Sequence, residues 1–308
     1  MVEQQTDVAS TRCGYVALVG APNAGKSTLL NQLVGAKIAI VTPKVQTTRT
    51  RVTAIAIEGD SQVIFVDTPG IFKPSRRLER AMVDAAWSGA EDADRIVLII
   101  DAVKGITADV ERIIAGLEKN QRRAHVILNK VDIVRRDSLL GLAKKLSERG
   151  IFDEIYMLSA LTGDGVEDLR SALAKEMPEG PWLYPEDQLA LAPMRQLAAE
   201  ITREKLFMRL NQELPYSLTV ETESWEERKD GSIKIQQVVF VSRANHKPIV
   251  LGKGGQTIKK VGELARADLE ESLGCRVHLF LFIKVREKWL DDPERYREMG
   301  LDFPKESS

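Results

Sequence analysis

The stretch Gly20-Ala21-Pro22-Asn23-Ala24-Gly25-Lys26-Ser27-Thr28 decides the fold of the first half of this chain. Its first eight residues fit the pattern G-x-x-x-x-G-K-[ST], and they lie between an apolar run, Tyr15–Val19, and a helix-like stretch, Lys26–Leu33. Glycines let the backbone wrap around a phosphate chain, so that N–H groups and the helix start face the anion. A plain strand-to-helix turn would give the Lys-Ser pair no role. The sequence therefore predicts a phosphate-binding loop in which Lys26 adds charge and Ser27 offers a hydroxyl to Mg²⁺.

Short β-branched runs alternate with helical stretches from Tyr15 to about Met177, as in a series of βαβ units. This alternation predicts an α/β fold with a doubly wound sheet and right-handed crossovers. The expected strands are Tyr15–Val19, Arg51–Ile57, Gln62–Val66, Ile96–Asp101, His125–Leu128 and Ile155–Leu158. The expected helices are Lys26–Leu33, Leu78–Ala90, Thr107–Glu118, Ser138–Arg149 and Val166–Glu176.

Length and composition limit the possible classes of protein. A chain of 308 residues fits two domains at about 150 residues each. With 44% hydrophobic and 29% charged residues, disorder is excluded for most of the chain. The two cysteines, Cys13 and Cys275, are too far apart in sequence to suggest a zinc motif or a disulfide framework. We find no signal peptide and no apolar run of about 18–20 residues, so we expect a cytoplasmic protein.

A further motif follows a later predicted strand and completes the phosphate-binding site. Asp67-Thr68-Pro69-Gly70 comes directly after the third strand. The carboxyl ends of strands in a doubly wound sheet meet at one edge, beside the phosphate loop. We expect Asp67 to hold Mg²⁺ through water and the Gly70 amide to face the terminal phosphate. Taken alone, this motif could be an ordinary Pro-Gly turn, and the loop upstream makes that alternative weaker.

The motif after the fifth strand, Asn129-Lys130-Val131-Asp132, predicts the choice of base. A carboxylate at Asp132 can accept hydrogen bonds from N1–H and the exocyclic amine of guanine, whereas adenine has no matching donors. Hydrogen bonds to charged groups contribute about 1.5–3 kcal/mol. The sixth strand is followed by Ser159-Ala160-Leu161, where a backbone amide could reach the guanine O6. The sequence therefore predicts guanine over adenine.

These four elements in this order resemble the translation-factor class of P-loop GTPases. In that family the polar stretch between the first two elements is the first switch, which here is Gln46-Thr47-Thr48-Arg49. One threonine of the switch closes onto Mg²⁺ and the γ-phosphate, and the Thr-Arg order favours Thr48 over Thr47. The resemblance implies GTP and GDP as ligands, with Mg²⁺ bound by Ser27, Thr48 and Asp67.

The residue after Gly70 departs from the family pattern. Many members carry a glutamine there to orient the attacking water, whereas this chain has Ile71. An apolar side chain cannot orient water, so we expect hydrolysis to depend on another group or a partner and to be slow unaided. The substitution resembles the hydrophobic-substituted GTPases, which include many ribosome-assembly factors.

The second half begins after a proline-rich stretch that breaks any helix. We predict a nucleotide-binding domain over residues 12–178, a linker over 179–187 and a second, smaller α+β domain over 188–303. The expected elements of that domain follow the order α-β-β-α-α-β, with Asp230-Gly231 as a hairpin turn. They are a helix over Pro193–Leu210, strands over Tyr216–Thr222 and Ile233–Val241, a short helix, a helix over Gln256–Leu273 and a strand over Arg276–Val285.

Basic residues are concentrated in this second domain. Residues 243–288 hold ten Lys or Arg and five Asp or Glu, a net of +5, so the rest of the −1 chain carries −6. The G-x-x-G stretch Gly252-Lys253-Gly254-Gly255 lies there between two helices, with Lys259 and Lys260 shortly after it. The loop could be a second nucleotide loop or a plain helix-helix turn. The element order around it instead resembles a KH domain of type II topology, whose loop clamps about four nucleotides of single-stranded RNA.

The combination of the Gln-Thr-Thr-Arg switch, the Asp-Thr-Pro-Gly-Ile turn and a C-terminal KH domain resembles bacterial ribosome-assembly GTPases. The match runs from Tyr15 to Phe303 and includes the Trp289-Leu-Asp-Asp-Pro run. It implies binding near the 3′ end of 16S ribosomal RNA, assembly of the small subunit and peripheral contact with the inner membrane. We also expect a monomer. Two other hypotheses stay open: a metabolic P-loop kinase or ATPase whose second half only oligomerises, and an RNA-binding adaptor that holds GTP without hydrolysing it.

Overall fold

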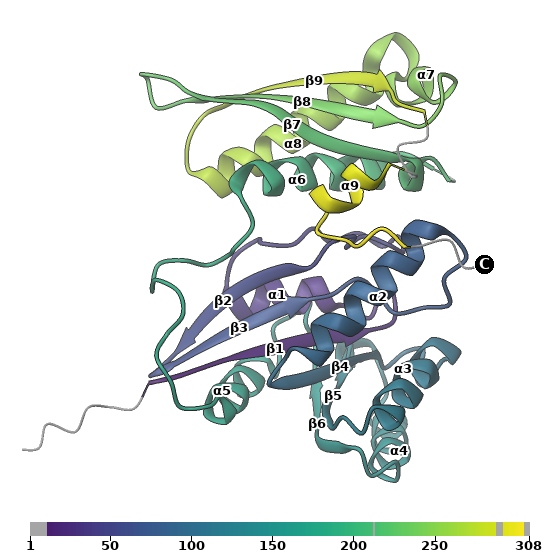
Figure 1. Cartoon of the computed structure of the whole chain (residues 1–308), viewed down its shortest axis with the longest axis vertical. Helices are drawn as coiled ribbons and strands as arrows, with labels where there is room; N and C mark the ends of the chain where they lie inside the picture. Colours follow the sequence, from purple (N-terminus) through teal and green to yellow (C-terminus); the bar gives the residue numbers. More distant parts are fainter. Residues whose placement is uncertain (1–10, 212, 288–291, 305–308) are drawn as a thin grey trace, which may run out of the picture. The chain divides into compact units, whose positions relative to one another are not determined.

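The computed structural model describes residues 11–211, 213–287 and 292–304, which form two compact units (Figure 1). The first unit comprises the described residues of segments 1–36, 51–72 and 86–191. The second comprises those of segments 37–50, 73–85 and 192–308. The second unit therefore contains two segments that come from the first half of the sequence.

The first unit is built on a six-stranded sheet in the order β2-β3-β1-β4-β5-β6. Helices α1 and α5 pack against each other and against β3. The fold is doubly wound α/β, as predicted. The strands are β1 (Arg12–Gly20), β2 (Val52–Glu58), β3 (Ser61–Asp67), β4 (Arg95–Asp101), β5 (Ala124–Asn129) and β6 (Phe152–Leu158). The helices are α1 (Lys26–Val34), α2 (Arg77–Glu91), which begins in the second unit, α3 (Ala108–Lys119), η1 (Val131–Ile133), α4 (Arg136–Ser147) and α5 (Val166–Glu176).

One strand of this sheet runs against the others. β2 pairs with β3 in antiparallel register, with Ile55 opposite Ile64, whereas the remaining neighbours are parallel. Two residues, Gly59 and Asp60, separate the two strands. A connection this short can only form a hairpin, because parallel strands need a crossover of a dozen residues or more.

The segment predicted as a linker over 179–187 packs on the first unit. The side chain of Gln62, which is fully buried, accepts hydrogen bonds from the backbone N–H groups of Leu183 and Tyr184 at 2.9 and 3.1 Å. Further along, the Ile55 amide donates to Leu189 O at 2.9 Å, which covers the outer edge of β2. The chain passes into the second unit at Ala192. The limits 12–178 and 188–303 stay sequence-based predictions.

The second unit contains a three-stranded sheet in the order β7-β8-β9. β7 and β8 are antiparallel, β8 and β9 are parallel, and α6 and α8 pack together on one face of the sheet (Figure 1). This α-β-β-α-α-β order is the one predicted from the sequence. The elements are α6 (Met194–Arg209), η2 (Leu214–Ser217), β7 (Leu218–Glu227), β8 (Ile233–Val241), α7 (His246–Leu251), η3 (Lys253–Gly255), α8 (Gln256–Leu273), β9 (Val277–Val285) and α9 (Pro293–Glu298).

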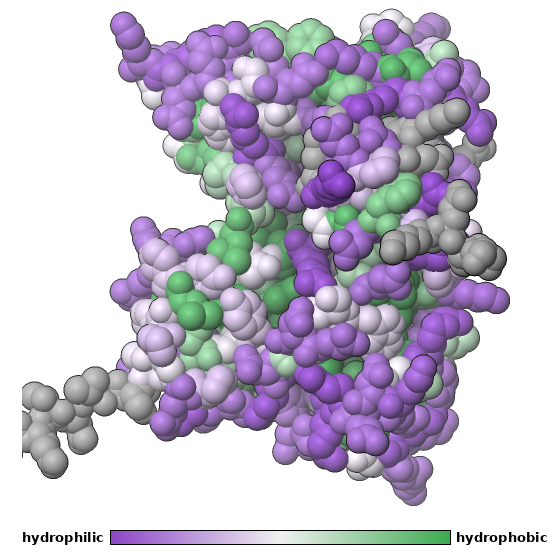
Figure 2. Space-filling view, viewed as in Figure 1, coloured by the Kyte–Doolittle hydropathy of each residue, from purple (hydrophilic) through white to green (hydrophobic). Residues whose placement is uncertain are grey.

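The chain beyond β9 packs on the start of α2, which belongs to the same unit. Tyr296 and Leu301 are buried against Leu78 and Met82. Residues 289–291 of the predicted Trp289-Leu-Asp-Asp-Pro run lie outside the described residues. Hydrophilic residues cover most of the face seen in Figure 2. Across the described residues, no helix combines the length and apolar character needed to cross a membrane.

Candidate nucleotide site and RNA-binding loop

The phosphate loop is packed so closely that only glycine fits at its two motif glycines. Gly25 has a φ of +102°, and a Cβ atom there would lie 2.1 Å from the side-chain nitrogen of Asn129. A Cβ atom on Gly20 would lie 2.5 Å from Ile99 O in β4. The loop therefore follows directly from the end of β1 into α1, and its glycines permit both the turn and the close approach of neighbouring strands.

Lys26 lies at the start of α1 with its side chain folded over the loop. It is only 6% exposed, and its Nζ donates hydrogen bonds to the carbonyls of Gly20 and Ala21, both at 3.1 Å. Burial lowers the pKa of Lys26, while the negative charge of Asp67 opposes that shift. The loop thus holds a cationic group of the kind that binds terminal phosphates.

Ser27 and Asp67 form a pair of oxygen ligands suited to Mg²⁺. Ser27 Oγ donates to Asp67 Oδ2 at 2.6 Å, and Asp67 is fully buried at the end of β3. Mg²⁺ prefers hard oxygen ligands such as carboxylates and hydroxyls. The chemistry and proximity of these two predicted residues therefore fit the metal.

The D-x-x-G turn leaves β3 and touches the phosphate loop. A Cβ atom on Gly70 would lie 3.0 Å from Pro22, and the Ile71 amide donates to Gly20 O at 3.1 Å. Thr68 Oγ1 donates to Leu18 O at 2.8 Å. The Ile71 side chain is fully buried in the core. An isoleucine at this position serves packing, which sequence reasoning had considered only as the absence of a catalytic amide.

Asn129 joins three of the predicted elements. Its Nδ2 donates to Ala24 O in the phosphate loop at 2.8 Å. Its Oδ1 accepts from the backbone N–H groups of Lys130 and Ala160 at 2.8 and 2.9 Å. A single buried amide therefore fixes the positions of the phosphate loop, the base-recognition motif and the Ser-Ala-Leu turn.

Lys130 is held by a residue that sequence reasoning missed. Its Nζ donates to Asp101 Oδ2 at 2.7 Å and to Asn23 O at 3.1 Å. Asp101 ends β4, so it reaches the same edge of the sheet as Asp67 and Asn129. The sequence signal that could have identified Asp101 is its position at the carboxyl end of a predicted strand.

The base-recognition side of the site faces solvent. Asp132 lies in η1 and is exposed, and the apolar side chains of Ile133 and Leu161 are 67% and 76% exposed. The turn after Ser159 is closed by its own hydrogen bonds, because Ser159 N donates to Asp164 O at 3.0 Å. An accessible carboxylate suits hydrogen bonding to a base, and exposed apolar side chains on the neighbouring motifs are available to pack against one.

The predicted switch residues Gln46, Thr47, Thr48 and Arg49 fall in the second unit. Gln46 Nε2 donates to Glu79 Oε1 at 2.9 Å, and Thr47 Oγ1 donates to Lys44 O at 2.8 Å. Thr48 as a magnesium ligand stays a prediction.

The glycine loop between α7 and α8 has an open outer side. Gly252, Gly254 and Gly255 all have positive φ angles, of +74°, +59° and +78°. A Cβ atom on Gly252 would lie 2.1 Å from Thr257 Oγ1, whereas Gly254 and Gly255 have no heavy atom within 4 Å of such a position. Polyanion backbone can therefore approach the loop at its last two glycines.

The predicted basic residues around this loop are accessible. Lys253, Lys259 and Lys260 are exposed. Lys260 Nζ donates to Glu263 Oε2 at 3.0 Å in an exposed pair, which contributes little to stability. The loop thus presents positive charge beside an open backbone surface.

Comparison with known families defines the class of protein. Residues 15–130 match the family described as "50S ribosome-binding GTPase", and residues 213–290 match the KH domain. The chain is thus a GTPase domain followed by a KH domain, as the sequence resemblance implied.

Full-length relatives narrow this class. The chain is 59% identical to "GTPase Era" of Rhizobium meliloti (strain 1021), over 99% of each chain, and 58% identical to "GTPase Era" of Afipia carboxidovorans, over 96% of each. A crystal structure of Aquifex aeolicus Era bound to GDP and AlF₄⁻ matches with a TM-score of 0.89 at 39% identity, covering 94% of this chain and 99% of that one. A structure of Era with MgGDPNP and nucleotides 1506–1542 of 16S ribosomal RNA matches with a TM-score of 0.88, again at 39% identity over 94% and 99%. The chain belongs to the Era family of GTPases.

Proposed function

We propose that this GTPase binds the 3′ region of 16S ribosomal RNA through its KH domain and acts in assembly of the small ribosomal subunit. One observation carries the proposal: the Era structure that contains both MgGDPNP and nucleotides 1506–1542 of 16S RNA matches 94% of this chain. The match covers 99% of that relative's own chain as well. The RNA partner of that relative is therefore the first candidate for this chain.

The roles of the phosphate-binding residues follow from their contacts. Lys26 would place its ammonium against the β- and γ-phosphates, since its Nζ already lies on the loop carbonyls. Ser27 and Asp67 would hold Mg²⁺, with Thr48 as the predicted third residue. Bound Mg²⁺ offsets negative charge on the terminal phosphates.

Guanine selection would rest on Asp132, with Asn129 positioning the motif. The exposed Asp132 carboxylate can accept two hydrogen bonds from guanine. The Ala160 amide donates to Asn129 Oδ1 at 2.9 Å and so holds the Ser159-Ala160-Leu161 turn against the same motif, and a backbone amide of that turn as the donor to guanine O6 stays a prediction. Adenine would leave the carboxylate without donors. The chain should therefore discriminate GTP from ATP.

Hydrolysis should be slow in the isolated chain. The position that supplies a water-orienting amide in many GTPases is Ile71, and its side chain is buried. A group from the substrate, a bound water or the ribosomal partner must supply this function. We expect small subunits to accelerate single-turnover hydrolysis, which also separates a GTPase from an adaptor that only holds GTP.

RNA binding is tested by direct titration of the full chain. An RNA with the sequence equivalent to nucleotides 1506–1542 should bind more tightly than a shuffled RNA of equal length, at one stated salt concentration. Basic residues near the loop predict that affinity for both RNAs falls with added salt, while the preference between them persists. Equal affinity for the two RNAs would contradict the proposed target.

Three further properties are proposed, and only the membrane contact comes from the family resemblance. They are a cytoplasmic location, peripheral contact with the inner membrane and a monomeric state. Cell fractionation of a tagged chain, with and without a high-salt wash of the membranes, tests the first two. Light scattering of the purified chain tests the third, and a mass near 34.3 kDa is expected.

A further inference from the structure

Two buried arginines bind the switch segment, residues 37–50, to the part of the second unit that follows residue 191, which we call the KH half. Arg49 is 4% exposed, and its guanidinium donates to Leu218 O at 2.8 Å and to Pro215 O at 3.1 Å. Arg203 in α6 is 1% exposed and donates to the backbone carbonyl of Thr47. We call Arg49, Arg203 and their partners the switch latch.

The latch holds the chain on both sides of Thr48. The residue before it is bound through its carbonyl by Arg203, and the residue after it is Arg49 itself. Peptide geometry leaves one residue little freedom when both of its neighbours are fixed. The KH half therefore restricts the position of the predicted magnesium ligand.

The latch brings two guanidinium groups close together around one aromatic ring. Both guanidinium groups lie over the Phe207 ring, with centroid distances of 5.5 Å for Arg49 and 4.9 Å for Arg203. Glu200 accepts two hydrogen bonds from Arg203, one of them at 2.7 Å. The Glu200 carboxylate thus lies close enough to act on both guanidinium groups. Burial and the charge of Arg203 lower the pKa of Arg49 to about 9, against the smaller opposing effect of Glu200.

This arrangement is a poor source of stability. Replacing buried charges with apolar side chains of similar volume is often neutral or stabilising, because desolvation cancels much of the Coulombic gain. Among the described residues, Arg203 Nη1 is also buried without a hydrogen-bond partner. What an arginine adds at position 49 is the ability to hold two carbonyls with one planar fork.

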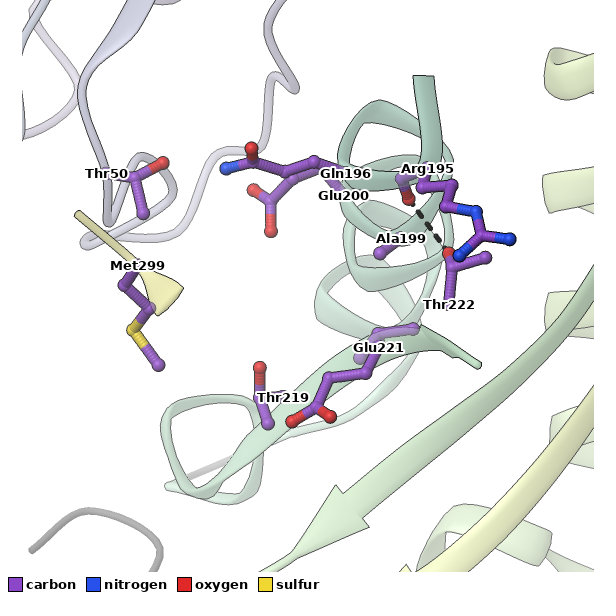
Figure 3. Close-up of a pocket in the computed structure, with 10 residues that line it drawn as sticks. Thr50, Arg195, Gln196, Ala199, Glu200, Thr219, Glu221, Thr222 and Met299 are labelled. Atoms are coloured by element: carbon purple, nitrogen blue, oxygen red, sulfur yellow. Dashed lines mark hydrogen bonds between the residues drawn. The ribbon is translucent and has the colours of Figure 1, made fainter. Parts of the chain in front are cut away.

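A cavity beside the latch leaves room for rearrangement. It has a volume of about 310 Å³, and Figure 3 shows Gln196 and Glu200 of α6 directed towards Thr50, with Met299 on the same side. Thr50 directly follows Arg49, and Glu200 is the ion-pair partner of Arg203. Side chains next to the latch can therefore move without displacing a packed core.

We propose that Arg49 and Arg203 are positioning residues that couple the switch threonine to the RNA-binding half. Nucleotide-dependent movement of Thr48 changes the latch, and the latch changes the KH half. The inference rests on the proposed RNA binding and on the predicted role of Thr48. Because coupling between two binding sites is reciprocal, RNA must alter nucleotide affinity by the same factor.

The test compares RNA affinity in two nucleotide states of the full chain. The probes are GDP, a non-hydrolysable GTP analogue and the RNA equivalent to nucleotides 1506–1542. We expect the wild-type dissociation constants for RNA in the two states to differ by about 5-fold or more. Arg49→Met, which can still cover Phe207, should bring this ratio to within about 2-fold of unity while GDP affinity and RNA affinity in one state are kept.

Two further variants control the comparison. Arg209→Met removes one charge from the exposed end of α6, the helix that contains Arg203, and should keep the wild-type ratio of the two RNA dissociation constants. Arg49→Lys keeps the charge but cannot hold both carbonyls as a planar fork, so it should also lose most of the coupling. Unchanged melting temperatures for all three would show that folding is intact.

Several results would overturn the inference. A wild-type ratio near unity, or a wild-type ratio retained in Arg49→Met, would show that the latch carries no coupling. Loss of GDP affinity in Arg49→Met would assign Arg49 to the nucleotide site instead. Failure of the wild-type chain to prefer this RNA over a shuffled one is a different result, because it contradicts the proposed function itself.

Discussion

The nucleotide site of the first unit and the switch latch of the second are assembled by opposite means. The site uses short motifs at the ends of neighbouring strands, and backbone groups and glycines supply most of its geometry. The latch joins Arg49 to Leu218, 169 residues further along the chain, through buried charged side chains. The first can be inferred from local pattern and sheet topology, whereas the second depends on tertiary packing.

The two buried cations illustrate this difference. Lys26 is buried near the opposite charge of Asp67, which favours its charged form. Arg49 is buried beside another cation, Arg203, which disfavours it. Burial lowers the pKa of both cations, but the neighbouring charge of Asp67 opposes that shift at Lys26, whereas the neighbouring charge of Arg203 adds to it at Arg49.

Lys26→Ala should produce the largest loss. The variant loses a charged hydrogen-bond donor to the phosphates, and we expect GDP affinity to fall by about 100-fold, on the order of 3 kcal/mol. Titration with a fluorescent GDP analogue measures this directly. Lys119→Ala, which removes an exposed lysine at the end of α3, should bind as wild type. Wild-type affinity in Lys26→Ala would refute the phosphate-loop assignment.

Asp132→Asn should change the base that the site prefers. An amide can pair with the second exocyclic oxygen of xanthine, so the variant should favour XDP over GDP, with a loss of GDP affinity of about 10- to 100-fold. Competition of GDP, XDP and ADP against a labelled nucleotide reports this order. Persistent guanine preference would remove Asp132 from base recognition.

Two glycines with similar backbone angles provide a matched stability test of the close packing in the site. Gly25 and Gly35 have φ angles of +102° and +72°, but only at Gly25 would a Cβ atom meet another residue, at 2.1 Å. Gly35→Ala should cost about 1 kcal/mol from backbone strain alone. Gly25→Ala should cost several kcal/mol more because Asn129 must move. Denaturant unfolding of the first unit should rank the two variants in that order, and equal costs would contradict this packing.

The smallest effect concerns acid stability, and one carboxylate in each unit tests it. Burial alone would raise the pKa of Glu176, but hydrogen bonds from Arg95 and His125 outweigh it and lower the pKa. At Asp268, burial alone would likewise raise the pKa, but hydrogen bonds from Lys205 and Lys37 outweigh it and lower the pKa. A lowered native pKa means that the stabilisation is present above the unfolded value and is lost as pH falls through the native one.

Unfolding midpoints measured from pH 7 down to pH 3 should therefore fall in the wild-type chain. Glu176→Gln should flatten this dependence for the first unit, and Asp268→Asn should flatten it for the second. A pH dependence that neither substitution alters would place the responsible carboxylates elsewhere.

Much of the fold followed from the sequence because its signals are local. The strand and helix ranges lie close to those observed, and β8 and α8 have the predicted limits. The antiparallel direction of β2 was missed, although the Gly59-Asp60 connection is too short for a crossover. Local signals therefore sufficed to predict the helices and strands, and the length of the β2–β3 connection would have predicted that β2 is antiparallel.

The candidate site likewise contains residues that local motifs predicted and contacts that they did not. The four motifs predicted which residues meet at the strand ends, but they gave no indication that Asn129 joins three of them or that Asp101 holds Lys130. The latch could not be predicted, because no local pattern relates Arg49 to Arg203. Such contacts are decided by which surfaces pack together.

The most direct test of the account is whether its two sites can be separated. Replacing Gly254 and Gly255 together with Asp adds negative charge at the open side of the KH loop, where added Cβ atoms meet nothing within 4 Å. Gly274→Asp is a matched control, since it has a φ of +65°, equally open space and a position at the end of α8.

The measurement is RNA and GDP binding by the same protein samples. The account predicts that the double variant loses RNA binding while keeping wild-type GDP affinity, and that the control keeps both. RNA binding that survives in the double variant, or loss of GDP binding together with RNA binding, would contradict it.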